Sequence, residues 1–416
     1  MAFKRVKGTN DFYPEDMIVR NKIFDSLRKS AESFNFKEVS APALETMNLL
    51  KCKSGEEVEK QIFVLEKRGK GSIGLRFELT ASLVRMFIER QKMLPKPVKW
   101  YSLSRMWRYE RPQKGREREF YQLSVELFGS DSFIADAEVI SLMIKCLTDL
   151  GLTKKDFVVK ISNRKLIQGL FMEFIDEKNI EKVFTEIDKI SKISRGELEA
   201  NLRDLSLDDD QIEQVYHIIL TEDIKTLEPK NKTAKEGLNE LNSLLERLDM
   251  NFVEVDLSTV RGLAYYTGTV FEIFDRQAKL RSIGGGGRYD DMVRLFGGEQ
   301  CPATGFGIGC STLTLLLKER GLLPEPDIAC DYFIATVGKD VLPEAQKIAS
   351  KLRTRFNVDM DITGRKLGKQ LSYANSIGAK NVIIIGEDEL KKGVLKVKDF
   401  TTGSEKSTTV DKIMKK

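Results

Sequence analysis

The chain has 416 residues, which at roughly 150 residues per domain suggests about three domains. Its 41% apolar and 31% charged residues are typical of a soluble globular protein and argue against a disordered, collagen-like or membrane-spanning one. The longest uncharged stretch, Cys301 to Leu317, contains one proline and several glycines and is shorter than a membrane span. The charged amino terminus does not resemble a signal peptide, so we expect a cytoplasmic protein without membrane association.

The net charge of +5 is unevenly distributed along the chain. From Asp331 to the end there are 17 Lys and Arg against 11 Asp and Glu, whereas the rest of the chain holds 51 against 52. A basic terminal region behind a neutral body indicates either a polyanionic partner or a solvated basic surface, and charge alone does not separate them.

Cysteine and histidine usage excludes several kinds of chemistry. The five cysteines are scattered and never form a C-x-x-C pair, so we expect reduced, mostly buried thiols and neither a disulfide framework nor a zinc ribbon. The single histidine, His217, cannot supply an H-E-x-x-H or multi-histidine zinc site. It lies in an apolar helical pattern, where packing is the simpler interpretation. Any catalysis must therefore depend on Arg, Glu, Gln, Thr and Tyr.

The first elements are indicated by apolar periodicity and by helix-start residues. In chain order we predict a helix from Pro14 to near Phe34, a strand segment Phe36–Leu44, a hairpin of Gln61–Leu65 with Ser72–Glu78, a helix Ala81–Glu89 capped by Thr80, a long antiparallel hairpin of Lys99–Glu110 with Phe120–Gly129, and a helix Ile134–Leu150.

The remaining chain changes character three times. Helical patterns extend from Asn163 to about Leu248. Strand character then returns in Phe252–Leu257, Thr267–Phe274 and the glycine-rich runs Gly284–Asp290 and Gly305–Gly309. The prolines of Leu323–Pro326 indicate a linker. Beyond it, Tyr332–Val337, Pro343–Phe356, Val358–Ile362, Leu367–Ile377 and Asn381–Ile385 alternate as strand and helix. This predicts a small C-terminal α/β domain with a mainly parallel sheet.

The long hairpin carries polar residues where chemistry is expected. In its second strand Phe120, Gln122, Ser124 and Glu126 share one face, while the other face is apolar core. A row of ring, amide and carboxylate indicates either a ligand site or a solvated outer face. In the first strand Arg108 and Glu110 share one face, and the loop adds Arg111, Lys114, Arg116 and Arg118. The guanidiniums of this set are suited to bidentate phosphate binding.

The segment Arg108–Gln122 resembles motif 2 of the class II aminoacyl-tRNA synthetases, specifically of the histidyl-tRNA synthetase family. Further segments resemble that family in order and spacing: Lys37–Glu45 (motif 1), Leu75–Thr80, Val260–Gly268, Gly284–Asp290 and Gly305–Gly309 (motif 3). The resemblance covers essentially the whole chain. It implies an α/β multidomain protein whose class II antiparallel-sheet catalytic core (1–162 and 249–325) carries a helical insertion (163–248), followed by an anticodon-binding domain (331–416).

The resemblance implies a histidine–tRNA ligase that forms histidyl-adenylate from histidine and ATP and then charges tRNA(His). Arg108 and Arg261 would act at the α-phosphate, and Arg116 would meet the outer phosphates with Mg²⁺. Glu110 and Phe120 would bind adenine, which Gly305 and Gly307 would let lie close to the backbone. No protein residue is assigned to the metal, and neither zinc nor an organic cofactor is implied. The family also implies a homodimer built through motif 1.

The histidine pocket follows from the same resemblance. Glu78, Thr80 and Gln122 would receive the α-amino group of L-histidine. Glu126 and Tyr266 would serve the two imidazole nitrogens, with Tyr265 close by. A pocket that hydrogen-bonds both nitrogens rejects apolar amino acids, because these would leave buried polar groups unpaired. The alternative, in which the two tyrosines only pack, stays open, chiefly for Tyr265.

Two positions depart from the family pattern. Thr312 stands where motif 3 carries an arginine, so Arg288 or a loop arginine would have to replace its charge, and Ala264 stands where an aspartate precedes the tyrosine pair. These departures keep a second interpretation open, a regulatory paralogue that binds histidine and partners ATP phosphoribosyltransferase. The retained Glu78, Arg108 and Arg261 argue against it, and a general RNA-binding module would not need a histidine pocket.

Overall fold

The computed structural model describes residues 3–52, 59–65, 71–190, 193–221, 223–260, 265–327, 329–400 and 402–415. The chain forms two compact units, one of residues 1–11 and 21–324 and the other of residues 12–20 and 325–416. Within the described ranges, no helix has both the length and the hydropathy needed to cross a membrane. Each unit is built around its own sheet.

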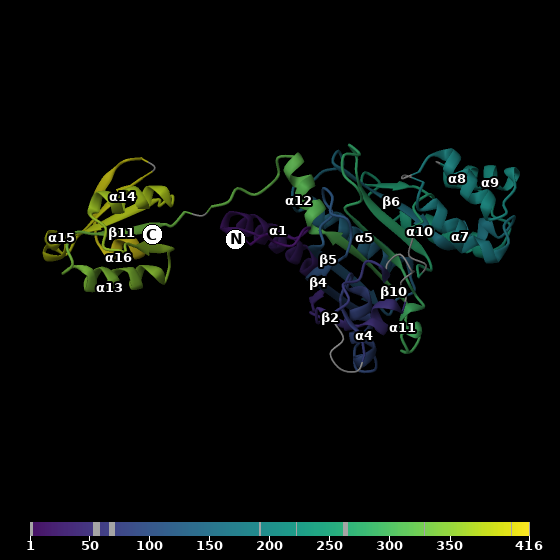
Figure 1. Cartoon of the computed structure of the whole chain (residues 1–416), viewed down its shortest axis with the longest axis horizontal. Coiled ribbons are helices and arrows are strands. Elements are labelled where there is room, and N and C mark those ends of the chain that lie inside the picture. The colour runs from purple at the N-terminus through teal and green to yellow at the C-terminus, as the bar shows by residue number, and fades with distance from the viewer. Residues whose placement is uncertain are drawn as a thin grey trace. The chain divides into compact units, whose positions relative to one another are not determined.

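An eight-stranded sheet forms the centre of the larger unit, in the order β1-β4-β5-β10-β9-β8-β6-β7 (Figure 1). Its strands are β1 (Lys37–Glu38), β4 (Val98–Trp107), β5 (Glu119–Phe128), β6 (Phe157–Asn163), β7 (Val253–Val255), β8 (Thr269–Asp275), β9 (Gly284–Arg288) and β10 (Ala303–Gly309). All neighbours are antiparallel except the two edge pairs, β1 with β4 and β6 with β7. The predicted antiparallel core is confirmed.

Helices cover this sheet with their apolar sides. They are α1 (Pro14–Ser33), through its buried residues from Ile23 onwards, α4 (Thr80–Arg90), α5 (Phe133–Thr148), α11 (Met292–Leu295) and α12 (Cys310–Glu319). Helix α2 (Met47–Lys51) instead buries Met47 and Leu50 in a separate cluster with Ile62 and Phe77. Leu83, Val84 and Phe87 of α4 join a buried cluster with Phe128 of β5, where the two phenylalanine rings stack with centroids 4.5 Å apart. A small separate sheet pairs β2 (Leu44–Thr46) with β3 (Ile73–Leu75). The end of β5 at Phe128 is therefore packed against α4.

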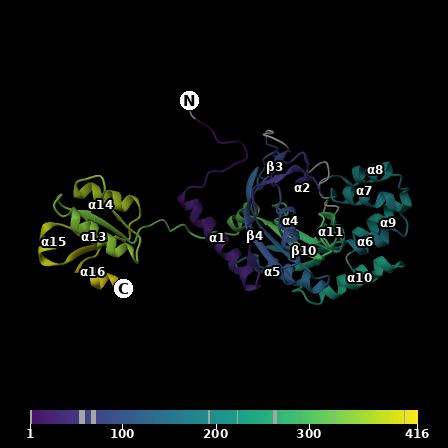
Figure 2. The ribbon, with the colours of Figure 1, turned by 90° about the horizontal axis from the view of Figure 1, so that it is seen from below.

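The helical segment leaves the sheet after β6 and returns at β7. It contains α6 (Arg164–Phe171), α7 (Glu177–Ile187), α8 (Arg195–Asp204), α9 (Asp209–Ile219), the 3₁₀ turn η1 (Ile224–Thr226) and α10 (Lys232–Leu245). In Figures 1 and 2, α7, α8 and α9 lie together beyond the β6 side of the sheet. Helices α6 and α10 approach so closely that a Cβ at Gly237 would lie 2.7 Å from Cα of Leu166. Glycine there permits backbone-to-backbone packing.

The smaller unit has helices on both faces of a five-stranded sheet, ordered β12-β11-β13-β14-β15. The strands are β11 (Tyr332–Thr336), β12 (Val358–Met360), β13 (Asn381–Ile385), β14 (Leu395–Asp399) and β15 (Glu405–Thr408), with helices α13 (Leu342–Arg353), α14 (Leu367–Ser376), α15 (Glu387–Lys392) and α16 (Val410–Met414). Along β11, Tyr332 and Ile334 join the cluster of α13, whereas Phe333 and Ala335 join that of α14. The alternation explains why every residue of this strand is buried.

The terminal sheet is less parallel than predicted. The three strands foreseen, β11, β12 and β13, are parallel, but β14 and β15 add two antiparallel pairs. Two further predictions need correction. Strand β6 was not predicted, and β4 ends at Trp107, so Arg108 and Glu110 lie beyond the strand rather than on its face.

Candidate active site

A cavity of about 480 Å³ opens over β5, beside the loop that joins β4 to β5. The loop between β8 and β9 and the beginning of α12 complete its walls. Its polar and aromatic lining comprises Arg108, Glu110, Gln113, Lys114, Arg116, Glu117, Phe120, Gln122, Glu272, Lys279, Arg281, Ser282, Ser311 and Thr312. The cavity thus gathers most of the residues that motif 2 had indicated, together with cations from a loop that it had not.

Arg108 is positioned by contacts on both sides. Its backbone N–H donates to the carbonyl of Arg118 at 2.9 Å, which continues the hairpin past the end of β4. Its Nε donates to the carbonyl of Phe77 at 3.0 Å, and its guanidinium carbon lies 5.2 Å from the ring centroid of Phe120. The arginine therefore lies between the Phe120 ring and the backbone that precedes Glu78.

Glu110 and Arg116 form an ion pair across the loop, with 3.0 Å between the carboxylate oxygen and Nη1. The Glu110 side chain is only 11% exposed, whereas that of Arg116 is 47% exposed. Both residues belong to the predicted ATP site. The arginine would have to leave this carboxylate, or share it, to bind a phosphate.

The loop between β4 and β5 is fastened to α12. Lys114 pairs with Glu319 at 2.8 Å, the Ser311 hydroxyl donates to Glu117 at 2.7 Å, and the Thr312 hydroxyl donates to the carbonyl of Gly115 at 3.2 Å. Thr312, the departure from motif 3, therefore holds the loop. Gly115 has φ +76°, a left-handed conformation that favours glycine.

Glu126 occupies a buried position next to three tyrosines. Its side chain accepts a short hydrogen bond from the hydroxyl of Tyr289, and both residues are 2% exposed. The ring of Tyr265 lies 4.6 Å from that of Tyr266 and 6.0 Å from that of Tyr289. Glu126 is therefore enclosed, and the polar face of β5 is not a solvated outer surface at this end.

Tyr289 is a functional candidate that the sequence interpretation missed. Burial raises the pKa of Tyr289 well above 10, and the neighbouring Glu126 charge adds to the shift. The hydroxyl consequently remains a donor over the physiological range. The signal was available, because Tyr289 belongs to the glycine-rich segment Gly284–Asp290 that resembles the family.

Glu78 and Thr80 lie at the start of α4, where the helix is capped differently from the prediction. Thr80 is the first helical residue and Leu79 is the N-cap, with no side-chain cap bond from either. Instead, the Glu78 carboxylate accepts from the backbone N–H of Ala81 at 3.2 Å. The prediction that Thr80 caps the helix is wrong, because the carboxylate one position before the N-cap makes the contact.

The glycines of β10 are explained by the side chains of β5. In the ladder Gly305 lies opposite Glu126 and Gly309 opposite Gln122. A Cβ on Gly305 would collide with the Glu126 carboxylate, and one on Gly307 would lie 2.7 Å from Nε2 of Gln122. Gly307 and Gly309 line the cavity, whereas Gly305 lies against Glu126. Gln122 itself donates to the Ser124 hydroxyl at 2.9 Å.

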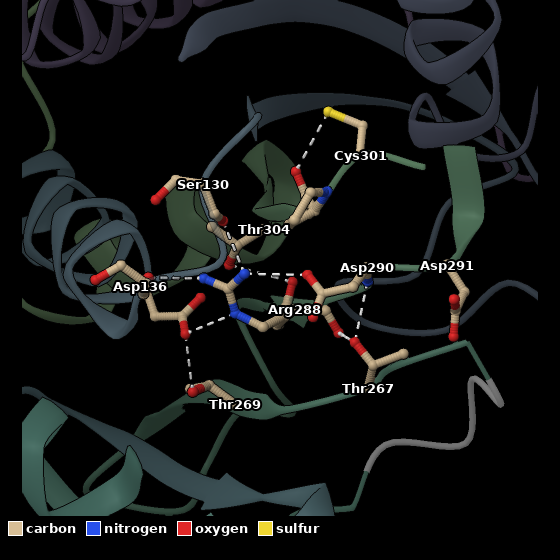
Figure 3. Close-up of polar contacts among 12 residues, drawn as sticks. Ser130, Asp136, Thr267, Thr269, Arg288, Asp290, Asp291, Cys301 and Thr304 are labelled. Carbon is tan, nitrogen blue, oxygen red and sulfur yellow. Dashed lines mark hydrogen bonds and ion pairs between the residues drawn. The ribbon is translucent and has the colours of Figure 1, made fainter. Parts of the chain in front are cut away.

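Arg288 is committed to a buried network rather than to the cavity (Figure 3). Its Nε donates to Asp136 of α5 at 3.0 Å, Nη1 donates to Asp290 at 3.0 Å, and its remaining donors reach the carbonyls of Ser130 and Ser132 at 2.9 Å. The suggestion that Arg288 could replace the motif 3 arginine is therefore wrong. Burial raises the pKa of Asp136, which the Arg288 guanidinium opposes.

Three further predictions concern Arg261 with Ala264, His217 and the cysteines. Arg261 and Ala264 lie outside the described residues. His217 lies on α9 with its side chain exposed, so the expectation that it packs is wrong, because Val215, Tyr216, Ile218 and Ile219 form the buried side of that helix. All five cysteines are free, and Cys146, Cys301 and Cys310 are buried, while Cys52 is exposed.

Comparison with known proteins identifies the relatives of this chain. A family model described as Histidyl-tRNA synthetase matches residues 8–313, and one described as Anticodon binding domain matches residues 331–416. The Histidine--tRNA ligase of Pyrococcus horikoshii is 38% identical over 432 residues, which cover 99% of this chain and 98% of the relative. That of Halobacterium salinarum is 38% identical over 416 residues, which cover 98% and 96%.

Solved structures give the same result. The crystal structure of histidyl-tRNA synthetase from Nostoc sp. PCC 7120 superposes with a TM-score of 0.82 at 25% identity and covers 100% of this chain and 99% of that one. A structure from Bacillus halodurans, described as an ATP phosphoribosyltransferase regulatory subunit/histidyl-tRNA synthetase, has a TM-score of 0.77 at 24% identity and covers 93% of this chain and 99% of that one. This second likeness shows a common fold and does not favour the regulatory interpretation.

Proposed function

The chain belongs to the histidyl-tRNA synthetase family, and from this membership we propose how its active site works. The reaction is that of a histidine–tRNA ligase: histidine and ATP give histidyl-adenylate and pyrophosphate, and the histidyl group then passes to tRNA(His). The class II fold and the anticodon-binding domain are those of the family. The regulatory alternative is not favoured, because the relatives that match over nearly the whole chain are ligases.

The first step needs positioning and positive charge rather than a protein nucleophile. The carboxylate of histidine attacks the α-phosphorus of ATP, and pyrophosphate leaves. We assign Arg108 to the α-phosphate and the attacking carboxylate, and Arg261 to the same centre by family resemblance. A charged donor that is already in place stabilises the negative charge that develops in the transition state. The fixed place of Arg108 between Phe77 and Phe120 supports its assignment.

ATP would enter as its magnesium complex and occupy the cavity with adenine on Phe120. Glu110 would accept from the adenine amino group, and Gly307 would let the base approach the backbone of β10. Arg116 would exchange its present contact with Glu110 for the outer phosphates. The 3.0 Å ion pair between them supports this, because it holds the Arg116 guanidinium at the cavity beside Glu110.

Histidine would bind on the Arg108 side of the cavity, towards Glu126. Glu78, Thr80 and Gln122 would contact the cationic α-amino group, and Glu126 with Tyr266 would contact the imidazole, beside Tyr265. The burial of Glu126 supports this assignment, because a carboxylate that is 2% exposed needs polar partners. The hydroxyl of Tyr289 supplies one of them.

The second step needs tRNA(His), which we assign in part to the terminal domain. This domain has 17 basic and 11 acidic residues from Asp331 to the end, and its positive net charge favours binding to a polyanion. We also propose a homodimer through Lys37–Glu45, as the family resemblance implies, and a cytoplasmic location, where ATP and tRNA are available. Sedimentation at micromolar concentration should give the mass of two chains, and a monomer would contradict the proposed assembly.

The observation that carries the mechanism is that Arg108 joins the two parts of the site, with Phe120 on one side and the chain leading to Glu78 on the other. Histidine-dependent exchange of pyrophosphate into ATP tests it directly. The wild-type protein should exchange only with histidine, and Arg108→Ala should lose at least about a hundredfold in rate, as expected when one preorganised charged donor is removed. Histidine binding without any exchange would instead favour a regulatory protein.

A further inference from the structure

The loop between β8 and β9 brings two cations, Lys279 and Arg281, to the cavity. Its shape is set by the Asp275 carboxylate, which accepts from the backbone N–H groups of Gln277 and Lys279, each at 3.0 Å. Arg320 also donates to this carboxylate at 2.5 Å. These contacts hold the loop in place where it leaves β8, on the segment that leads to Arg281.

Arg281 differs in its partners from Lys114 and Arg116, the two cations of the β4–β5 loop that line the cavity. Lys114 is paired with Glu319 and Arg116 with Glu110, so both of these charges already face a carboxylate. Arg281 donates to the neutral side-chain oxygen of Gln113 at 3.0 Å, and among the described residues no carboxylate lies within ion-pair distance of it. Its charge is thus available to an anionic ligand.

Arg281 also lies near the position where motif 3 lacks its arginine. The backbone N–H of Gly309, where β10 gives way to α12, donates to the carbonyl of Ile283 at 3.1 Å, so the end of the loop runs beside the start of that helix. Arg281 contacts Gln113, and Thr312 contacts Gly115, on the same short turn of the β4–β5 loop. Thr312 is neutral, so Arg281 supplies the charge at this end.

The turn also connects Arg281 to Arg116. The backbone groups of Gln113 and Arg116 exchange hydrogen bonds of 3.0 and 2.9 Å, so the residue that Arg281 contacts is directly paired with the residue assigned to the outer phosphates. Two guanidiniums, Arg116 on the turn and Arg281 in contact with it, can hold the oxygens of a polyphosphate in a bidentate manner. A lysine would offer a point charge with less geometric definition.

We infer that Arg281 binds the β- and γ-phosphates of ATP together with Arg116, and that it provides here the charge that Thr312 does not. This inference rests on the proposed function of the cavity. It assigns the nucleotide site a residue from outside the three class II motifs. Arg281 is exposed and makes no buried contact, so its substitution should leave the fold intact.

The test compares Arg281→Gln with Arg276→Gln, which removes the same charge from the same loop. Arg276 pairs with Glu254 at 2.6 Å and is not part of the cavity lining, so it serves as the matched control. In histidine-dependent pyrophosphate exchange without tRNA, Arg281→Gln should raise the KM for ATP by at least about tenfold, as expected for one lost charge-assisted hydrogen bond. The KM for histidine should stay within about twofold, and Arg281→Lys should recover part of the loss.

A calorimetric titration with ATP supplies a readout that does not depend on turnover. Arg281→Gln should bind ATP more weakly, and Arg276→Gln should match the wild type. Equal ATP affinity and exchange kinetics in Arg281→Gln would overturn the inference, as would a defect confined to the KM for tRNA, which would place the arginine on the polynucleotide. If the wild-type protein bound ATP without any exchange, the proposed function would fail, and the titration would still decide the role of Arg281.

Discussion

Glu126 is the buried carboxylate that we assign to the imidazole of histidine. It lies at the interior end of the polar row on β5, where the ladder places it opposite Gly305. We predict that Glu126→Ala weakens histidine binding by at least about tenfold, because the imidazole loses its charged partner, while ATP affinity stays within about twofold. Calorimetry with each ligand measures both effects. The control is Glu119→Ala on the same strand, whose carboxylate pairs with Arg105 at 2.9 Å away from the cavity. Unchanged histidine affinity would contradict the assignment.

Tyr289 should make the stability of the folded protein depend on pH in the alkaline range. Because burial and the Glu126 charge raise the pKa of Tyr289 well above 10, the folded protein holds this proton more tightly than the unfolded chain does. The corresponding stabilisation is complete below about pH 10 and is lost as the pH rises towards the folded-state pKa. Between about pH 10 and 11 the free energy of unfolding, measured by denaturant titration, should therefore fall more steeply in the wild type than in Tyr289→Phe. The two slopes should differ by up to about 1.4 kcal/mol per pH unit. Parallel curves would refute this linkage.

At the residue scale the sequence was most informative where a motif fixed both identity and spacing. The predictions for Arg108, Glu110, Arg116, Phe120, Gln122 and Gly307 fall on the lining of one cavity, although their roles stay predictions. The contacts of Arg288 with Asp136, of Tyr289 with Glu126 and of Arg281 with Gln113 were not predicted, because each depends on which side chain the fold brings beside it. Local pattern does not contain that information.

The contact between α5 and β9 depends on a buried ion pair. Arg288 and Asp136 are 3% and 2% exposed in their side chains, and the arginine adjoins Tyr289. Arg288→Met should cost about 3–5 kcal/mol of unfolding free energy, because it leaves a buried carboxylate without its cation. Adding Asp136→Asn should recover part of that loss. Urea unfolding checks both variants.

The control for the ion pair is the half-exposed pair of Arg276 and Glu254, with 31% and 49% side-chain exposure. Arg276→Met should change the unfolding free energy by less than about 1 kcal/mol. Equal costs for the two arginine variants would mean that burial does not govern the Arg288 contribution.

Two strands, β6 and β14, were not predicted, and for different reasons. Strand β6 has six of its seven residues buried, so its sequence lacks the alternation that marks a half-buried strand. Strand β14 could have been found, since Leu395 and Val397 are buried and Lys396 is exposed in regular alternation. The long helices α1 and α5 begin and end within two residues of their predicted bounds.

At the scale of the whole molecule, the two compact units suggest separable roles. Every residue assigned to activation lies before Cys310, whereas the basic excess begins at Asp331. A chain that ends at Pro324 should retain histidine-dependent pyrophosphate exchange within about threefold and lose most tRNA charging. The loss should grow with salt, because the near-neutral body has few phosphate contacts with which to hold tRNA.

A salt series of aminoacylation rates measures this effect, and the full-length chain is the reference at each ionic strength. If the truncated chain charged tRNA as efficiently as the whole chain throughout, the terminal basic residues would be a solvated surface and the anticodon-binding assignment would be wrong. If the truncated chain lost both pyrophosphate exchange and tRNA charging, the stability or activity of the larger unit would depend on the smaller one.

The parallel pairing of β6 with β7 limits how the helical segment could be shortened by engineering. The chain leaves at Asn163, the far end of β6, and must re-enter at Val253 to run in the same direction. Val253 lies opposite Val159, so the return spans roughly 13 Å of β6, and parallel neighbours generally need a crossover of about a dozen residues or more. A tight turn in place of residues 164–252 would reverse the edge strand. A miniaturised enzyme would therefore have to keep a return path from Asn163 back to the level of Val159.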